Sequence, residues 1–378
     1  MTRPVVSIVG GYGATGEVVA TELLRLTDCA IRIGGRDRGR AEGLSARLGP
    51  RVSGHRMDVF EPSLAAFCAG ASVVVNCAGP TARIGPRVAE AAFDQGAHMV
   101  DPGGYESVHD AFAGRRDELV RRGLTGLISA GWIPGLSEVF PRYMHTLASQ
   151  RLVTFDSLEL IYGDASAWST TGTLDQVEHI RRNLFRASGL YRGGRWRRGG
   201  LGAASIARLP APWGRQLAVL HLFPELRGFA ESHPQYRRLR SRATLLGVRT
   251  LLTMTAVALV GDRRRRRAVR WLQTAFRREA ERYGNGGLLT VTIAGRDRSG
   301  APAGCRGLLH DSRHYWLTGV VPAVATAQLL DGTIRAQGVR YLGDAVEPNR
   351  FLAQLERAGL QFDTEFDPGP NGAAARAA

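Results

Sequence analysis

The chain has 378 residues, enough for two domains, and a formal net charge of +16 at neutral pH. All 50 basic residues are arginines, so Schiff-base lysine enzymes, the lysine of a phosphate-binding P-loop and the Tyr-x-x-x-Lys acid of short-chain dehydrogenases are excluded. The four cysteines form no C-x-x-C pair, which implies no metal site and predicts free thiols in a reducing compartment.

The first predicted strand, Val5–Val9, runs into a glycine loop that is followed by apolar residues at helical spacing. Glycine permits the tight turn and lets a phosphate approach the backbone, and the following helix directs free N–H groups at that phosphate. A strand before the loop and a helix after it is the context that a dinucleotide site requires. We therefore assign the loop to a dinucleotide, through Gly11, Tyr12, Gly13, Ala14, Thr15 and Gly16.

The second predicted strand, Cys29–Ile33, ends where NAD-binding chains usually offer an acidic residue to the ribose. Here Arg36 stands in that region, and its guanidinium suits a 2′-phosphate, with Arg38 as a second candidate contact. The sequence thus predicts NADP(H) as the cofactor, while the neighbouring Asp37 keeps NAD open as an alternative.

Four more apolar runs continue the alternation of strands and helices. They predict an α/β fold, an N-terminal Rossmann domain with a doubly wound parallel sheet, from the strands Arg51–Arg56, Ser72–Cys77, Ala97–Asp101 and Leu124–Ser129. Their carboxyl ends supply further cofactor candidates, namely Asp58, Asn76, Cys77, Ala78 and Gly79. We expect Asp101 to bind a protonated imine or amine and Tyr105 to relay a proton, although Asp101 also suits a turn or helix cap.

The pattern changes near residue 150 to alternating strands without regular helices between them, which predicts a second α+β domain on a mixed or antiparallel sheet. The predicted strands cover residues 155–164, 215–223, 288–297 and 306–317. The predicted domains are a Rossmann domain (1–150), a substrate and dimerisation domain (151–317) with a basic helical insertion (181–283), and C-terminal helices that return to the first domain (318–378).

The positive charge lies in the middle of the chain. Residues 1–150, 151–283 and 284–378 carry formal charges of +1, +15 and 0. This excess favours anionic partners, but no nucleic-acid motif accompanies it, so we predict no nucleic-acid binding. The apolar stretch 243–261 is too short to span a membrane, and three alternatives stay open: a helix buried against the second sheet or a homodimer partner, a helix on an anionic membrane surface, or the lining of an acyl-chain pocket.

An ordered set of segments across most of the chain resembles the saccharopine dehydrogenase-like reductases. The segments are GGYGATG (10–16), VVVNCAGP (73–80), GAHMVDPGGY (96–105), AGWIPGLSE (130–138), STTGT (169–173) and YWLTGVVPAVATAQLLDG (315–332). The resemblance implies a nicotinamide-dependent reductase acting on an imine or, in some relatives, on a carbon–carbon double bond of a polyketide-derived lipid. Ile133 stands where saccharopine reductases have an acid, which argues against saccharopine as substrate.

We expect a cytoplasmic NADPH-dependent reductase of a C=N bond in a small metabolite that is anionic or an amine or imine. The alternatives are a C=C reductase acting on a carrier- or lipid-linked acyl chain, with an acyl carrier protein or membrane as partner, and a non-catalytic NADP-binding scaffold. His310 and His314 have i, i+4 spacing, but their strand context argues against a metal pair. The substrate candidates are Trp132, Ser169, Thr171, Thr173 and Tyr315.

Overall fold

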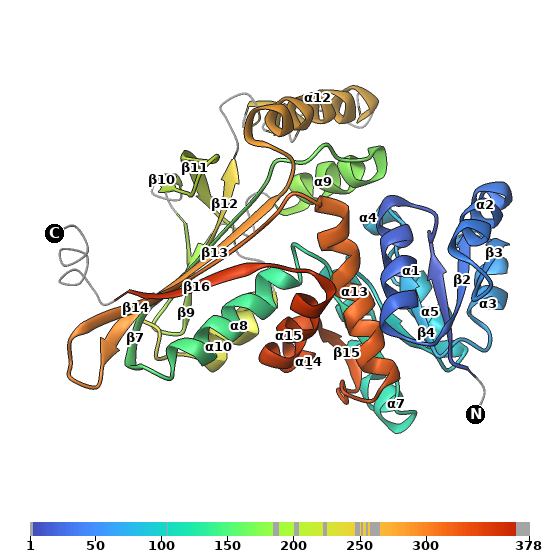
Figure 1. Cartoon of the computed structure of the whole chain (residues 1–378), viewed down its shortest axis with the longest axis horizontal. Coiled ribbons are helices and arrows are strands. Elements are labelled where there is room, and N and C mark those ends of the chain that lie inside the picture. Colours follow the sequence, from blue (N-terminus) through green and yellow to red (C-terminus); the bar gives the residue numbers. More distant parts are fainter. Residues whose placement is uncertain are drawn as a thin grey trace. The chain divides into compact units, whose positions relative to one another are not determined.

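The computed structural model describes residues 3–367 except 104, 184–188, 200–203, 222–224, 246–249, 251, 255 and 258–264. Its chain divides into two compact units (Figure 1). The first unit contains Met1–Val139 and Tyr315–Leu360, and the second contains Phe140–His314 and Gln361–Ala378. The chain crosses between the units three times: inside α8 (Leu136–Ala148), inside α13 (His314–Leu330) and between Leu360 and Gln361. The predicted domain limits at residues 150 and 317 stay predictions.

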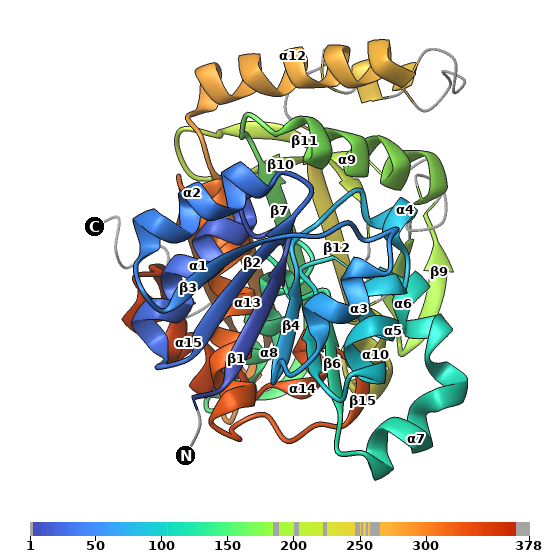
Figure 2. The same ribbon diagram turned by 90° about the vertical axis from the view of Figure 1, so that its right-hand side faces the viewer.

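Seven parallel strands form the sheet of the first unit, in the order β15-β6-β5-β4-β1-β2-β3 (Figure 2). Six of them confirm the predicted strands within one or two residues. Most consist largely of buried apolar residues, as strands covered on both faces require, whereas the edge strand β3 is mostly exposed. The bounds are β1 Val5–Val9, β2 Ala30–Gly35, β3 Val52–Arg56, β4 Val73–Asn76, β5 His98–Val100, β6 Thr125–Ile128 and β15 Gly338–Tyr341.

Helices cover both faces of this sheet, which confirms the doubly wound Rossmann fold (Figure 2). One face carries a core in which Phe67, Phe93 and Phe112 pack together with aliphatic side chains. On the other, α13 packs so closely on α1 that a Cβ at Gly319 would lie 2.6 Å from the Val18 side chain. The helices are α1 Ala14–Leu26, α2 Arg38–Leu48, α3 Ser63–Cys68, α4 Thr81–Ile84, α5 Arg87–Asp94, α6 Tyr105–Ala111, α7 Arg116–Arg121, α14 Leu342–Ala345 and α15 Pro348–Ala358, with a 3₁₀ turn at Ala113–Arg115.

The second unit is built on a nine-stranded mixed sheet in the order β10-β11-β12-β7-β13-β14-β16, with β8 and β9 attached beside β12. Only β12 and β7 pair in parallel; the other described pairs are antiparallel. The predicted mixed sheet is therefore confirmed. The bounds are β7 Leu152–Asp164, β8 Gly189–Arg192, β9 Arg195–Arg198, β10 Ala204–Arg208, β11 Arg215–Leu220, β12 Arg238–Leu245, β13 Gly287–Asp297, β14 Pro302–Asp311 and β16 Phe362–Asp367.

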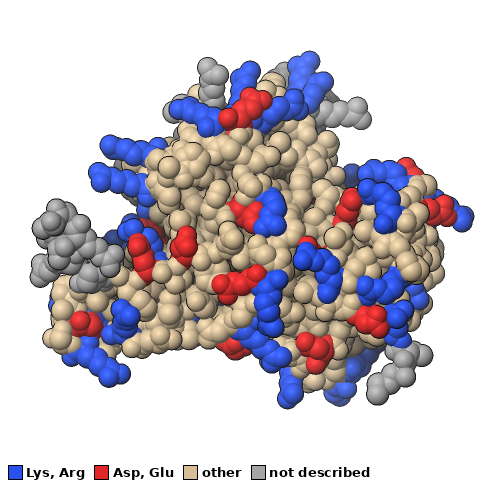
Figure 3. Space-filling view, viewed as in Figure 1, with Lys and Arg blue, Asp and Glu red and all other residues tan. Residues whose placement is uncertain are grey.

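Helices α9 (Thr170–Asn183), α10 (Glu225–Ser232) and α12 (Arg265–Tyr283) belong to the second unit, together with the part of α8 that it contains. Helix α12 is amphipathic: Leu272 and Phe276 pack against Val177 of α9. Its other face exposes basic side chains, visible over α12 in Figure 3, from Arg267, Arg270, Arg277, Arg278 and Arg282. These five arginines of α12 thus form a solvated face opposite a buried apolar one.

Two sequence predictions are wrong in this unit. The segment 181–283 is not a helical insertion, because β8 to β12 occupy much of it. Its arginines hid the strand pattern, although Gly193 and Gly194, both at positive φ, form the two-residue turn of a hairpin. The strand predicted over 306–317 ends at Asp311, whose carboxylate accepts the Arg313 N–H at 2.7 Å, and α13 begins at His314.

The apolar stretch 243–261 begins as the last three residues of β12, and its three alternative roles stay predictions. Its described residues between 250 and 257 are helical, and Val257 is buried against α9 and α12 rather than against the sheet. The C-terminal segment predicted as helices also contains β15 and β16. In the described part of the chain, no helix combines the length and the hydropathy needed to cross a bilayer.

Candidate functional site

The glycine loop between β1 and α1 leaves space where a ligand could approach its backbone. Gly10, at φ +73°, donates its N–H to the carbonyl of Gly34 at 2.9 Å and so ties the loop to β2. A Cβ at Gly16 would lie 2.5 Å from the Gly10 carbonyl oxygen, so only glycine allows the helix to pack this close. A Cβ at Gly13 would meet only that oxygen, at 3.1 Å. Gly13 therefore borders open space, whereas Gly16 is required for packing.

The amino-terminal end of α1 has no side-chain cap. Gly13 is its N-cap residue and makes no side-chain hydrogen bond. The first N–H groups of a helix have no partner within the helix, and the helix dipole adds positive potential at this end. Together with the open space at Gly13, this end of α1 fits the pyrophosphate of a dinucleotide.

Tyr12 packs flat against the end of β2. A Cβ at Gly35 would lie 2.3 Å from the tyrosine ring, so glycine is needed there. The Tyr12 hydroxyl accepts the backbone N–H of Asp37 at 3.0 Å, and the Arg40 guanidinium lies 4.6 Å from the ring centroid. Tyr12 thus holds the β2–α2 turn in place and orients Arg40 beside it.

The charges at this turn favour a ligand phosphate over a bare ribose. The Asp37 carboxylate accepts the Arg40 N–H at 3.0 Å and thereby caps α2, and Arg38 pairs with Glu42 at 2.7 Å. Arg36 is exposed, and no acidic side chain in the described ranges pairs with it. Arg36 and Arg40 are therefore the available cations. Sequence analysis missed Arg40, because only the fold places it over Tyr12.

A buried polar network connects the carboxyl ends of β4 and β5. The Asn76 amide donates to Asp101 Oδ2 at 2.8 Å, and the other carboxylate oxygen accepts the Gly103 N–H at 2.8 Å. Asn76 Oδ1 in turn accepts the Ala78 N–H at 3.2 Å. Both side chains are almost fully buried. The structure thus brings two predicted site residues, Asn76 and Asp101, into direct contact, while Asp101 also supports the local turn.

Burial shapes the acid–base properties of this network. It raises the pKa of Asp101 to about 6, against the opposing effect of the hydrogen bonds from Asn76 and Gly103. Burial also raises the pKa of the Cys77 thiol, and the negative charge of Asp101 adds to that shift. Asp101 therefore exchanges its proton near neutral pH, whereas Cys77 stays a neutral thiol.

The remaining cofactor candidates are Ala78 and Gly79, which lie near the glycine loop, and Asp58, which follows β3. Ala78 lies against the loop, because a Cβ at Gly10 would come within 2.9 Å of its nitrogen, and Gly79 follows it. The Asp58 carboxylate accepts the Phe60 N–H at 3.0 Å in the turn after β3. The contacts of these three residues with a cofactor stay predictions.

The turn after β6 has an unusual backbone. Ser129 adopts a φ of 53°, which non-glycine residues rarely do, and its N–H donates to the Gly103 carbonyl at 2.7 Å. The Trp132 indole is buried, and its Nε1 has no hydrogen-bond partner in the described part of the chain. Trp132 is therefore a core residue of the first unit, and its predicted contact with substrate stays a prediction.

The second unit contains a histidine–carboxylate pair that sequence analysis missed. His314 Nδ1 lies 2.5 Å from Asp164 Oδ2, and Asp164 Oδ1 accepts the Ser166 N–H at 2.7 Å and the Trp168 indole N–H at 3.2 Å. The nearby His314 charge and these hydrogen bonds outweigh burial and lower the pKa of Asp164. The Trp168 ring stacks on His314, with 5.6 Å between centroids.

The substrate candidates within residues 169–173 lie at the beginning of α9, which starts at Thr170. Ser169 Oγ accepts the Gly172 N–H at 3.1 Å, as helix caps do. Thr173 is fully buried, and its hydroxyl donates to the Ser169 carbonyl at 2.9 Å. Thr171 is exposed. The two threonines therefore lie on different faces of α9, and their contacts with substrate stay predictions.

The two predicted tyrosines begin helices. Tyr105 is the first residue of α6, and its side chain lies outside the described residues. Tyr315 is the second residue of α13 and is half-buried. Their roles as proton relay and substrate contact stay predictions.

Comparison with known proteins places the glycine loop in a recognised domain. Residues 6–125 match the family model described as the saccharopine dehydrogenase NADP binding domain. No curated protein sequence matches the chain significantly. Among solved structures, apo saccharopine dehydrogenase (L-Glu forming) from Saccharomyces cerevisiae aligns with a TM-score of 0.68 and 14% identity, covering 96% of this chain and all of that one. This likeness shows a shared fold over both units.

Two further structures align less closely. A mutant of meso-dapdh from Clostridium tetani E88, solved with DAP, has a TM-score of 0.48 and 14% identity, covering 94% of this chain and 99% of that one. GenD2 from gentamicin A biosynthesis, solved with NAD, has a TM-score of 0.47 and 15% identity, covering 97% of each chain.

Proposed function

We propose that the chain, whose residues 6–125 match the saccharopine dehydrogenase NADP binding domain, is an NADP(H)-dependent oxidoreductase that reduces the C=N bond of a small metabolite. The proposal rests mainly on Asp101, a buried residue at the carboxyl end of β5. Burial raises the pKa of its carboxyl group to about 6. In doubly wound sheets ligands bind outside the carboxyl ends of the strands, so Asp101 stands where an acceptor would react.

The residues of the first unit fit the cofactor. The open space at Gly13 and the uncapped end of α1 would hold the pyrophosphate, and Arg36 with Arg40 would hold the 2′-phosphate. When bound, NADPH supplies a hydride from C4 of its nicotinamide. The protein itself must bind the acceptor, orient it and stabilise its protonated form.

Asp101 would stabilise the protonated form of the acceptor. As a carboxylate it would bind the protonated form of the substrate, in which the nitrogen of the C=N bond carries a positive charge and an N–H. Hydride addition to the carbon turns this cation into a neutral amine, and the amine then takes one proton from water. Overall, one C=N bond, one hydride and two protons give one protonated amine, and NADP⁺ leaves. Asn76 would keep Asp101 aimed by its hydrogen bond to Oδ2.

The sign of the charge favours a C=N acceptor over a C=C acceptor. Hydride addition to an α,β-unsaturated thioester builds negative charge on the carbonyl oxygen, and such charge needs donors or cations nearby. A buried carboxylate would oppose it. Hydride addition to a protonated imine instead discharges a cation, which a carboxylate stabilises beforehand.

The test is NADPH consumption by the purified protein with sets of carbonyl compounds and amines, each given alone and in pairs. We expect turnover only with a pair, and a loss on the order of 10²-fold in kcat/KM for Asp101→Asn. Turnover with an enoyl thioester and none with any pair would exclude the proposal. Carboxylate-bearing pairs should be included, since the chain is strongly basic.

A further inference from the structure

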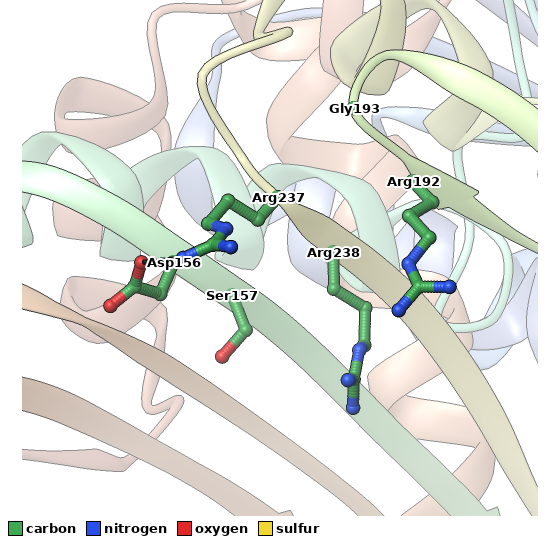
Figure 4. Close-up of a pocket in the computed structure, with 6 residues that line it drawn as sticks. All are labelled: Asp156, Ser157, Arg192, Gly193, Arg237 and Arg238. Carbon is green, nitrogen blue, oxygen red and sulfur yellow. Dashed lines mark ion pairs between the residues drawn. The ribbon is translucent and has the colours of Figure 1, made fainter.

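Three arginines line a cavity of about 550 Å³ in the second unit. It lies where the β8–β9 turn meets the beginning of β12 beside β7 (Figure 4). Its lining consists of Asp156, Ser157, Arg192, Gly193, Arg237 and Arg238. One carboxylate thus accompanies three guanidinium groups, so the cavity carries an excess of positive charge.

Two of these arginines are direct neighbours across the sheet. Arg192 of β8 and Arg238 of β12 are paired in the antiparallel register, so their side chains leave the same face. In Figure 4 both guanidinium groups point to the same side of the ribbon. No acidic side chain in the described ranges pairs with either one. Like charges placed directly opposite each other destabilise a sheet. Arg208 and Arg215 on β10 and β11 (Ala204–Arg208 and Arg215–Leu220) oppose each other in the same way, so the cavity around Arg192 and Arg238 is what distinguishes this pair.

Arg240 and Arg242, further along β12, are neutralised by an acidic side chain of the neighbouring strand. Glu159 of β7 lies 2.5 Å from Arg240 and 2.8 Å from Arg242, and it is the register partner of Arg240. The register partner of Arg238 is Ser157, which carries no charge. The sheet therefore provides an internal anion for Arg240 and Arg242 but none for Arg238 and Arg192.

The backbone holds these groups in place. The Gly193 N–H donates to the Arg237 carbonyl at 3.2 Å and fastens the hairpin turn to the start of β12. Asp156 is the single acid in the lining, and it pairs with Arg237 at 3.9 Å. The guanidinium groups of Arg192 and Arg238 therefore lie side by side in the cavity without an acidic partner in the described residues, and backbone hydrogen bonds hold the strands that carry them.

We propose that this cavity binds a phosphate group with two negative charges. Two adjacent guanidinium groups can each donate two parallel N–H bonds to phosphate oxygens, and the Ser157 hydroxyl adds one more donor. The cavity is larger than a phosphate ion, so the group belongs to a phosphorylated small molecule or to a phosphomonoester lipid headgroup. The proposal concerns the second unit alone and does not rest on hydride transfer.

The test uses the full chain saturated with NADP⁺, so that the cofactor site is filled, and follows inorganic phosphate by ³¹P NMR titration. We expect saturable binding that weakens at least tenfold in R192Q/R238Q. The matched control is R208Q/R215Q, which removes the same charge from an exposed cross-strand pair on β10 and β11 outside the cavity. The control should change the dissociation constant less than twofold.

Equal weakening in both double variants would overturn the proposal, because it would reduce the effect to net charge. Unchanged binding in R192Q/R238Q would also overturn it. A second pair of arms distinguishes the sources: glycerol 3-phosphate as a soluble phosphomonoester, and vesicles of phosphatidylcholine with or without phosphatidic acid. Sensitivity of either arm to R192Q/R238Q, but not to the control, identifies the source, and insensitivity of both contradicts the site.

Discussion

At the scale of single residues, cofactor choice depends on Arg36. Its guanidinium is exposed and unpaired in the described structure, while Arg38 is neutralised by Glu42. We expect Arg36→Ala to weaken NADPH binding by about 1.5–3 kcal/mol, roughly 10- to 150-fold, and to leave NADH binding nearly unchanged. Arg38→Ala is the matched control and should change neither affinity. Fluorescence titration with both cofactors measures this, and an unchanged preference in Arg36→Ala would refute the assignment.

Asp101 predicts a pH dependence. Burial raises its pKa to about 6, so the carboxylate is mostly ionised at pH 7 and gains a proton as the pH falls through 6. If the charged form binds the protonated substrate, kcat/KM should decline below pH 6 and this acidic limb should be absent in Asp101→Asn. The pH profile of both proteins decides it. An identical limb in the variant would assign the ionisation to another group.

At the scale of elements, two glycines of one loop have different tasks. Gly13 borders open space at an ordinary φ of −76°, whereas a Cβ at Gly16 would overlap the Gly10 carbonyl oxygen. Gly13→Val should therefore abolish NADPH binding without changing the unfolding midpoint. Gly16→Ala should lower the free energy of unfolding by about 1–3 kcal/mol. Calorimetry together with cofactor titration tests both, and cofactor affinity that survives in Gly13→Val would argue against the dinucleotide site.

The Asp164–His314 pair joins the end of β7 to the start of α13. Removing the histidine leaves a largely buried carboxylate, so His314→Gln should cost about 3 kcal/mol of unfolding free energy at neutral pH. The pKa of Asp164 is lowered, so the contribution of this group is present above its ordinary pKa and disappears as the pH falls through the folded value. Denaturant unfolding at pH 7 and pH 3 measures this. His310→Gln, exposed on β14, is the control.

The same elements show what the sequence could predict. Most of the six strands predicted in the first unit are short apolar runs, since both faces of a parallel sheet are buried, and these six were located within one or two residues, whereas β15 was not predicted. The strands β8, β9 and β12 carry arginines whose charge obscured their alternation. Asp164 and His314 are 150 residues apart. No local pattern links them, so only the fold could reveal the pair.

At the scale of the whole molecule, the two units differ in composition and in the sites that we assign to them. The first unit holds the NADP-binding loop and the Asn76–Asp101 network. The second contains the arginine-rich region 151–283, with its formal charge of +15. The proposed phosphate site lies there. A homodimer, contact with an acyl carrier protein or a membrane surface, and a cytoplasmic location stay predictions. Charge reversal at Arg264, Arg265 and Arg266, whose side chains lie outside the described residues, would test the contact with a carrier protein or a membrane.

We propose that this protein transfers a hydride from NADPH to the carbon of a C=N bond. The most direct measurement follows deuterium from 4-deuterated NADPH, labelled on either face, into products formed from carbonyl and amine pairs. The account predicts an amine with one deuterium on the former carbonyl carbon, transferred from one face only, and little product with Asp101→Asn. Deuterium at the β-carbon of a saturated thioester, with no labelled amine from any pair, would contradict it.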